Sequence, residues 1–215
     1  MNQLLIITGP TSGLGKELTR IALEKNREIL LLGRDLKEKL PASFVSGGNF
    51  YIEIDFGNPE ECISVFNSID FSRYSKIDLV LNAGAIMPIA QILEINFEEF
   101  TKCLDINFLS QVALVKSLLA NLDLSGTNLG ILHVSTGAIS RVIDGWSSYS
   151  VSKAAFAKFL THLEIEIPEI NIQSFDPGVF ESKIQEQIRR SLGQEQVELT
   201  LPSAEKAAQA LFKRI

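Results

Sequence analysis

Short apolar runs alternate along this chain with longer segments of helical periodicity. The runs are rich in Leu, Ile and Val with little polar alternation, which predicts strands covered on both faces, as in a parallel sheet. The predicted strands are Leu4–Thr8, Glu28–Gly33, Asn49–Asp55, Asp78–Asn82, Gly130–Ser135 and Asn171–Phe175. The predicted helices are Leu14–Lys25, Pro59–Ile69, Phe97–Leu122, Tyr149–Ile165 and Ser203–Arg214. The alternation predicts an α/β fold: a single doubly wound domain over residues 1–215, with a parallel sheet of about six strands and helices on both faces.

Composition argues against several classes of protein. Of the 215 residues, 46% are hydrophobic and 21% are charged, which allows a substantial core. The formal charge of −6 comes with no basic block, which argues against a nucleic-acid partner. The apolar run in "MNQLLIITGP" has no basic region before it, so we interpret it as a strand rather than a signal peptide. We expect no membrane-crossing run and a cytoplasmic protein without a metal site, in which Cys62 and Cys103 are reduced, buried thiols.

The loops after the predicted strands should carry the chemistry, because ligands of a doubly wound sheet bind outside the carboxyl ends of its strands. These loops read "TGPTSGLG", "GRD", "DFGN", "NAGAIM", "STGAIS" and "DPGVFES". Ordinary turn chemistry would explain glycine beside Ser, Thr or Asn in any one loop, but it explains the whole set less well. The least regular stretch is Phe180–Leu201, for which we expect a loose helix or a mobile lid.

The first loop, "TGPTSGLG", follows the first predicted strand and opens the first predicted helix. Gly9, Gly13 and Gly15 would let the backbone approach a pyrophosphate and let the helix pack close to the strand. The helix N-terminus would then present free N–H groups to the phosphates. Since the loop lacks the lysine and spacing of an ATP-type P-loop, it predicts a dinucleotide site.

The end of the second predicted strand bears on the choice of dinucleotide. Arg34 stands where a guanidinium could form forked hydrogen bonds with a 2′-phosphate, which favours NADP(H). Asp35 is the next residue. If its carboxylate turned inward it would bind the ribose hydroxyl and favour NAD(H), which stays possible.

The stretch "SSYSVSKAA" places Tyr149 four residues before Lys153, so both side chains lie on one face of a predicted helix. A phenol has a pKa of about 10. A nearby cation favours the phenolate and lowers that pKa. Tyr149 could therefore act as general acid toward a carbonyl oxygen or as general base toward an alcohol.

Together these stretches resemble the short-chain dehydrogenase/reductase family from Leu4 to about Ser182. The matching elements are "TGPTSGLG", "NAG" at the end of the fourth predicted strand, Asn107, Ser135, "YSVSK" and "DPGVFES". A Tyr-x-x-x-Lys pair is common by chance, but a serine 14 residues upstream and the glycine loop make it highly specific. The resemblance implies a Rossmann-type domain that reduces a small-molecule carbonyl to an alcohol with a nicotinamide cofactor, for which Arg34 favours NADPH. The chain is also similar to small carbonyl reductases of the sepiapterin-reductase and benzil-reductase kind.

The resemblance implies roles for individual residues. Tyr149 would be the general acid, and Lys153 would also hold the nicotinamide ribose. Ser135 would bind the substrate oxygen, and Asn107 would support a water chain that feeds protons to Lys153. The implied cofactor-binding residues are Gly9, Thr11, Ser12, Gly13, Leu14, Gly15, Arg34, Asp55, Asn82, Ala83, Gly84, Tyr149, Lys153, Pro177, Gly178, Val179 and Ser182. Five apolar residues are expected to line the substrate pocket, although core packing explains them equally well: Met87, Ile139, Ile143, Trp146 and Phe180.

Two expectations concern assembly and the end of the sheet. The wide apolar band of Phe97–Leu122 predicts a homodimer or homotetramer. The family usually continues past its last helix into a seventh strand, which is expected to be absent because this sequence stops at "FKRI". An alternative function on the same fold is a non-catalytic NAD(P)-sensing module, but the complete set of catalytic residues favours an enzyme.

Overall fold

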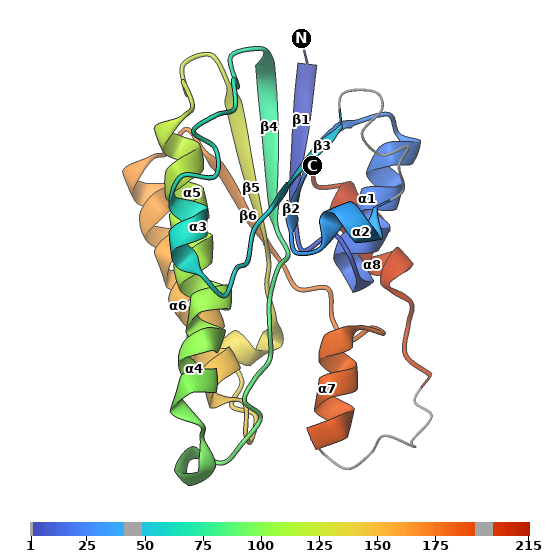
Figure 1. The fold of residues 1–215 in the computed structure, drawn as a ribbon, viewed down its shortest axis with the longest axis vertical. Coiled ribbons are helices and arrows are strands. Elements are labelled where there is room, and N and C mark those ends of the chain that lie inside the picture. Colours follow the sequence, from blue (N-terminus) through green and yellow to red (C-terminus); the bar gives the residue numbers. More distant parts are fainter. Residues whose placement is uncertain (1, 41–48, 192–199) are drawn as a thin grey trace.

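A six-stranded parallel sheet forms the centre of the fold in the computed structural model, which describes residues 2–40, 49–191 and 200–215 (Figure 1). Its strands are β1 (Asn2–Thr8), β2 (Glu28–Gly33), β3 (Phe50–Glu53), β4 (Tyr74–Leu81), β5 (Asn128–Val134) and β6 (Asn171–Phe175). The strand order is β3-β2-β1-β4-β5-β6, and every neighbouring pair is parallel. The chain therefore winds outward in both directions from β1 and β4, which confirms the predicted doubly wound sheet. Such a switch point is where α/β proteins bind ligands.

Helices cover both faces of this sheet (Figure 1). Alternate residues of β1 face opposite ways, so Leu4 and Ile6 enter one core while Leu5 and Ile7 enter the other, all without exposed surface. The first core lies under α3 (Pro59–Ile63), α5 (Ser110–Ala120) and α6 (Ser147–Glu166). The second lies under α1 (Gly13–Glu24) and α8 (Ala204–Phe212). The short elements are α2 (Leu36–Lys39), η2 (Ile92–Glu94) and η4 (Gly137–Ile139).

The predicted single helix Phe97–Leu122 is interrupted by a π-helical turn. It consists of α4 (Phe97–Leu104), the π turn η3 (Asp105–Leu109) and α5. Such a turn is an irregularity often found at functional sites. Here it carries Asn107, which is only 1% exposed.

The same helical segment is the most apolar of the fold. Among the described residues, Phe97–Ala120 is long and apolar enough to cross a membrane by length and composition, with a hydropathy of 1.4. The expectation that no run of this kind exists is therefore wrong. In the fold, 44% of the apolar window is buried, and Leu114, Val115 and Leu118 belong to the core against the sheet. Core packing accounts for this apolar character.

The region beyond the carboxyl ends of the strands holds α4 and α7 (Lys183–Ser191) (Figure 1). The predicted irregular stretch Phe180–Leu201 thus contains a helix, while its residues 192–199 lie outside the described residues. α3 ends at Ile63 rather than at Ile69 as predicted. The next residues, "SVFNS", include Ser, Asn and β-branched Val, all of which lower helix propensity.

Candidate active site

A cavity of roughly 850 Å³ opens at the carboxyl ends of the strands, within the size range of small-molecule sites. All of the loops singled out from the sequence contribute to its wall. Every predicted cofactor and catalytic residue lines it except Gly15 and Asn107, which lie behind the wall. The sheet has therefore gathered residues from the whole chain around one space.

The glycine loop turns sharply between β1 and α1. Gly9 and Gly13 have φ angles of 65° and 50°, a left-handed conformation that favours glycine. A Cβ at Gly15 would lie 2.2 Å from the carbonyl oxygen of Gly9, so α1 packs against the loop more closely than any side chain allows. Ser12 precedes α1 without capping it through its side chain. The N–H groups of the first turn are thus left for a ligand in the cavity.

Asn82 fixes the shape of this loop from the end of β4. Its Nδ2 donates hydrogen bonds to the carbonyl oxygens of Thr8 and Gly9, each at 3.0 Å. In return, the Thr8 hydroxyl accepts from the N–H groups of Asn82 and Ala83, each at 2.9 Å. This end of the cavity is a preformed cradle, and its glycines and free N–H groups fit a dinucleotide.

Charged side chains of both signs gather at the far end of the glycine loop. Arg34 is exposed and its Nη1 lies 3.7 Å from Oδ1 of Asp55. Asp35 has a left-handed φ of 56°, and its carboxylate accepts a hydrogen bond from Nζ of Lys39 at 2.7 Å. The same Oδ1 of Asp55 also accepts a hydrogen bond from the N–H of Gly57 at 2.8 Å, which stabilises the turn after β3. Lys39 lines the cavity and was not singled out from the sequence.

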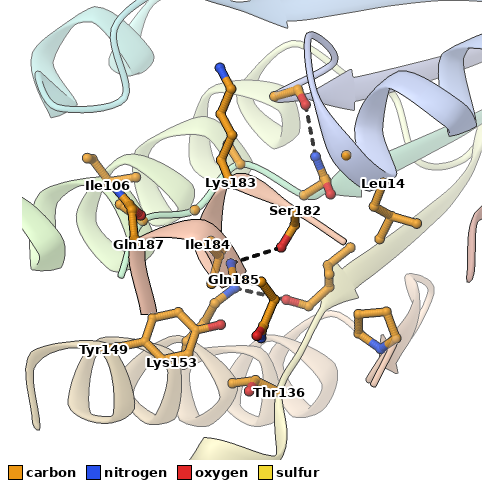
Figure 2. Close-up of a pocket in the computed structure, with 18 of the residues that line it drawn as sticks. Leu14, Ile106, Thr136, Tyr149, Lys153, Ser182, Lys183, Ile184, Gln185 and Gln187 are labelled. Atoms are coloured by element: carbon orange, nitrogen blue, oxygen red, sulfur yellow. Dashed lines mark hydrogen bonds between the residues drawn. The ribbon is translucent and has the colours of Figure 1, made fainter. Parts of the chain in front are cut away.

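Tyr149 lies near the start of α6 and is 7% exposed. Burial raises the pKa of its phenol to about 12, only partly offset by a hydrogen bond with the Thr136 side chain, which lowers it. Thr136 also lines the cavity beside Ser135, and Figure 2 shows it next to Tyr149 and Lys153. The expected lowering of the phenol pKa by Lys153 is absent, because burial dominates and the lysine is engaged elsewhere. At neutral pH the phenol keeps its proton.

Lys153 is buried one turn after Tyr149, with 4% of its surface exposed. Its Nζ donates a hydrogen bond to the carbonyl oxygen of Val134, at the end of β5, at 2.9 Å. Burial lowers its pKa to about 8, so it remains largely cationic at neutral pH. A Cβ at Gly84 would lie 3.9 Å from this Nζ, so the glycine leaves room beside the cation.

Asn107 joins the loop after β4 to α6 from behind the cavity wall. Its Oδ1 accepts from the N–H of Ala85 at 2.9 Å, and its Nδ2 lies 2.8 Å from the Ala85 carbonyl oxygen. The same Nδ2 lies 3.0 Å from Oγ of Ser152, the neighbour of Lys153. The side chain thus fixes the relative positions of the "NAG" loop and the Lys153 helix.

The segment after β6 forms another part of the cavity wall. Gly178 has a φ of 69°, and its N–H donates to Oδ1 of Asp176 at 2.9 Å. The Ser182 hydroxyl accepts from the N–H of Gln185 at 3.2 Å and so begins α7. Figure 2 shows residues of α7 above Tyr149.

Apolar side chains also contribute to the cavity wall. Four of the five apolar residues expected in the substrate pocket line it: Met87, Ile143, Trp146 and Phe180. Ile139 does not line the cavity, which corrects that expectation. The sequence analysis missed Thr136, Arg141, Ile184 and Ile188. The four-residue spacing of Ile184 and Ile188 in a polar stretch was the available signal for an amphipathic α7.

Comparison with known proteins agrees with this architecture. The family model described as short chain dehydrogenase matches residues 3–193. An uncharacterized oxidoreductase of Schizosaccharomyces pombe is 31% identical over 90% of this chain and 77% of its own. Benzil reductase ((S)-benzoin forming) of Bacillus subtilis is 30% identical over 88% of this chain and 79% of its own.

A solved structure shares the fold. A short-chain dehydrogenase/reductase from Saccharomyces cerevisiae is 26% identical, with a TM-score of 0.74 over 100% of this chain and 83% of its own. The family match covers most of the chain, including the glycine loop, the "NAG" loop and the Tyr149–Lys153 helix. The chain therefore belongs to the short-chain dehydrogenase family and is an NAD(P)-dependent oxidoreductase.

Proposed function

We propose that this enzyme reduces the carbonyl group of a small molecule to an alcohol with NADPH, using Tyr149 as the proton donor. One observation carries the proposal: a buried phenol whose pKa is raised to about 12 faces a cavity whose other end fits a dinucleotide. A phenol that keeps its proton at neutral pH is poised to give it to a carbonyl oxygen. The relative from Bacillus subtilis, named as a benzil reductase, supports a carbonyl substrate.

The proton transfer involves two hydroxyl groups. When bound, the reduced nicotinamide supplies a hydride to the carbonyl carbon. Tyr149 donates its proton to the carbonyl oxygen, and this leaves a phenolate. The Thr136 hydroxyl accepts from the N–H of Ala138 at 3.3 Å and is free to donate to the Tyr149 oxygen, which stabilises the phenolate. Ser135, the residue expected to bind the substrate oxygen, also lines the cavity and is a second candidate for a hydroxyl that binds this oxygen.

Lys153 is proposed to hold the ribose hydroxyls next to the nicotinamide and to keep a positive charge near the phenolate. With a pKa of about 8, it can also pass a proton toward Tyr149 after reaction. Asn107 is proposed to support the water chain that refills Lys153. Its bonds with Ala85 and Ser152 hold it in place for this role.

The remaining cofactor contacts follow the wall of the cavity. The loop Gly9–Gly15 is proposed to receive the phosphates. Asn82–Gly84 would lie under the adenine ribose, and Asp55 would bind the adenine amino group. The Pro177–Val179 backbone would face the nicotinamide, with Ser182 beside its amide or a phosphate.

Arg34 is proposed to select NADP(H). It is exposed at the edge of the cavity, and its pair with Asp55 is long at 3.7 Å, so the guanidinium is available to a phosphate. Lys39 adds a second cation near this position and occupies the carboxylate of Asp35. A bound 2′-phosphate would therefore meet two cations, whereas a 2′-hydroxyl would find Asp35 already engaged.

The decisive experiment pairs NADPH binding with turnover in Tyr149→Phe. This variant keeps the ring and removes only the oxygen, so turnover of a reducible carbonyl should fall about 10²–10⁴-fold. NADPH affinity should stay close to that of the parent. Tyr51→Phe, which removes a phenol from β3 outside the cavity, is the matched control and should keep parental turnover.

Two outcomes would count against the proposal in different ways. If Tyr149→Phe reduces a good substrate at nearly the parental rate, the proton comes from another group. If the parent binds NADPH tightly but reduces no aldehyde, ketone or diketone in a broad panel, a sensing module on this fold becomes the better explanation.

A further inference from the structure

We infer that the substrate carries an anionic group, such as a carboxylate, near its reacting carbonyl, and that Arg141 binds this group. The inference rests on the proposed reduction and names its substrate class: oxo acids with an apolar body. Arg141 lines the same cavity as Tyr149 and was not assigned any role by the sequence motifs.

The guanidinium of Arg141 packs against Gly137, in the loop that also carries Ser135 and Thr136. A Cβ at Gly137 would lie 2.1 Å from Nη2 and 2.9 Å from Cζ of Arg141, so the guanidinium occupies the space that a side chain at 137 would fill. Gly137 directly follows Thr136, whose side chain lines the same cavity as Tyr149 and lowers the pKa of its phenol. The positive charge of Arg141 therefore lies beside the loop that follows β5.

The guanidinium has no acidic partner in the part of the chain that the structure describes. The N–H and Nε of Arg141 both point to the Gly137 carbonyl oxygen, at 3.1 and 3.5 Å, which leaves its two Nη groups for a ligand. Two acids of this region have other partners: Asp144 accepts from Gln91 at 2.7 Å, and Asp176 accepts from the N–H of Gly178 at 2.9 Å. A carboxylate matches two parallel N–H donors of a guanidinium.

The wall beside this cation is apolar. Ala138 and Ile188 are buried beside Tyr149, and Trp146 meets the Tyr149 ring edge to face at 6.0 Å. Arg141 itself is exposed, so its attraction for an anion is screened by salt, while the buried wall favours an apolar body next to the charged group. Lys183 is another cation in the wall, and Figure 2 shows it extending away from Tyr149. The arrangement suits an apolar or aromatic body that places its carboxylate at Arg141 and its carbonyl at Tyr149.

A matched pair of substrates separates charge from shape. Phenylglyoxylate and its methyl ester share the same ketone and ring, but only the acid carries a negative charge. In Arg141→Gln, the ratio of kcat/KM for the acid over the ester should fall about tenfold or more, the usual effect of losing a charge-assisted bond. Arg141→Lys should restore part of that ratio, and Lys183→Gln should leave it within threefold of the parent.

Binding gives a readout that does not depend on turnover. The NADP⁺-loaded enzyme should bind mandelate, the alcohol product of phenylglyoxylate, about tenfold or more tightly than its Arg141→Gln variant does. Added salt should weaken mandelate binding to the parent more than to the variant.

The inference fails if the acid-to-ester ratio is equal in the parent and Arg141→Gln, or if Lys183→Gln lowers it as much. It also fails, with the proposed function intact, if the parent reduces neutral ketones or diketones but not phenylglyoxylate. An enzyme that reduces no carbonyl with NADPH would instead overturn the proposed function itself.

Discussion

Lys39 holds the carboxylate of Asp35, with its Nζ 2.7 Å from Oδ2 one helical turn further along the chain. This hydrogen bond is the main reason that the pKa of Asp35 is lowered, so the carboxylate stays ionised and engaged with the lysine. The neighbouring Arg34 is left to face the cavity. The pair therefore bears directly on which dinucleotide the enzyme prefers.

Removing Arg34 should weaken NADPH far more than NADH. A lost charge-assisted hydrogen bond costs about 1.5–3 kcal/mol, so Arg34→Ala should lower NADPH affinity roughly tenfold or more. Fluorescence titration with both dinucleotides measures this difference. Lys37→Ala, on the neighbouring helix but outside the cavity wall, is the control. Equal weakening of NADPH and NADH in Arg34→Ala would show that the arginine contacts a part common to both.

The hydroxyl groups of Ser135 and Thr136 should contribute unequally to turnover. Because the Thr136 side chain favours the ionised form of Tyr149 and lowers the pKa of its phenol, Thr136→Val should lower kcat about 10²-fold, in the range of lost oxyanion donors. Thr136→Ser, which keeps the hydroxyl, should recover most of the rate, and Ser135→Ala should have the smaller effect. Steady-state turnover with saturating NADPH measures all three variants. A larger loss in Ser135→Ala would return the catalytic hydroxyl to the serine expected from the sequence.

His133 should make the protein less stable in mild acid. It is 1% exposed, neither ring nitrogen has a hydrogen-bond partner among the described residues, and burial lowers its pKa to about 2. The unfolded chain takes up this proton below about pH 6.5 while the folded chain does not, so stability falls as the pH drops. The contribution approaches about 1.4 kcal/mol per pH unit.

Urea unfolding between pH 7.5 and 5 measures that slope. In His133→Leu, which keeps an apolar contact with Phe156, the free energy of unfolding should depend less steeply on pH. His162→Gln, on the exposed face of α6, serves as the control and should keep the parental slope. Equal slopes in the parent and His133→Leu would show that the buried histidine takes up a proton in the folded state.

The protein should form a homodimer through the face of η3 and α6. Leu109 and Val151 are 44% and 51% exposed on these adjacent elements, an apolar surface that a partner would cover. Sedimentation at micromolar concentration should give a dimer or tetramer, and the double variant Leu109→Glu with Val151→Glu should give a monomer. Ile63→Glu, which adds a charge on α3, should not change the assembly. A parental monomer would contradict this prediction.

Much of the fold could be predicted because buried parallel strands are simple apolar runs. β2 and β6 have the predicted bounds, whereas β4 begins at Tyr74, because its first residues, "YSKI", mix polar and apolar side chains. The π turn around Asn107 was not predicted, since an extra residue in a helix leaves no clear mark on hydrophobic periodicity. The hydrophobic pattern of a short segment is enough to predict a buried strand. It does not predict how an irregular segment such as η3 is shaped by the elements packed against it.

The sequence predicts which residues line the candidate site better than it predicts their pKa values. Motif spacing identified Tyr149 and Lys153, and the structure brings both to the cavity. The direction of the Tyr149 pKa shift was wrong, because it depends on burial by segments distant in sequence. Thr136 was missed for a related reason. The sequence does not distinguish two neighbouring hydroxyl groups, because the backbone conformation determines which of them points toward the Tyr149 phenol.

The π turn η3 holds one residue more than a regular helical turn does, and it does so without rotating the helices on either side of it. Deleting one residue between Asp105 and Leu109 would therefore restore regular winding, with α4 still packed on α6 and α5 still packed on α3 and the sheet. The cost would fall on Asn107, whose side chain bridges Ala85 and Ser152 from this turn. A one-residue deletion in η3 should thus leave the fold in place and remove the link between the "NAG" loop and the Lys153 helix.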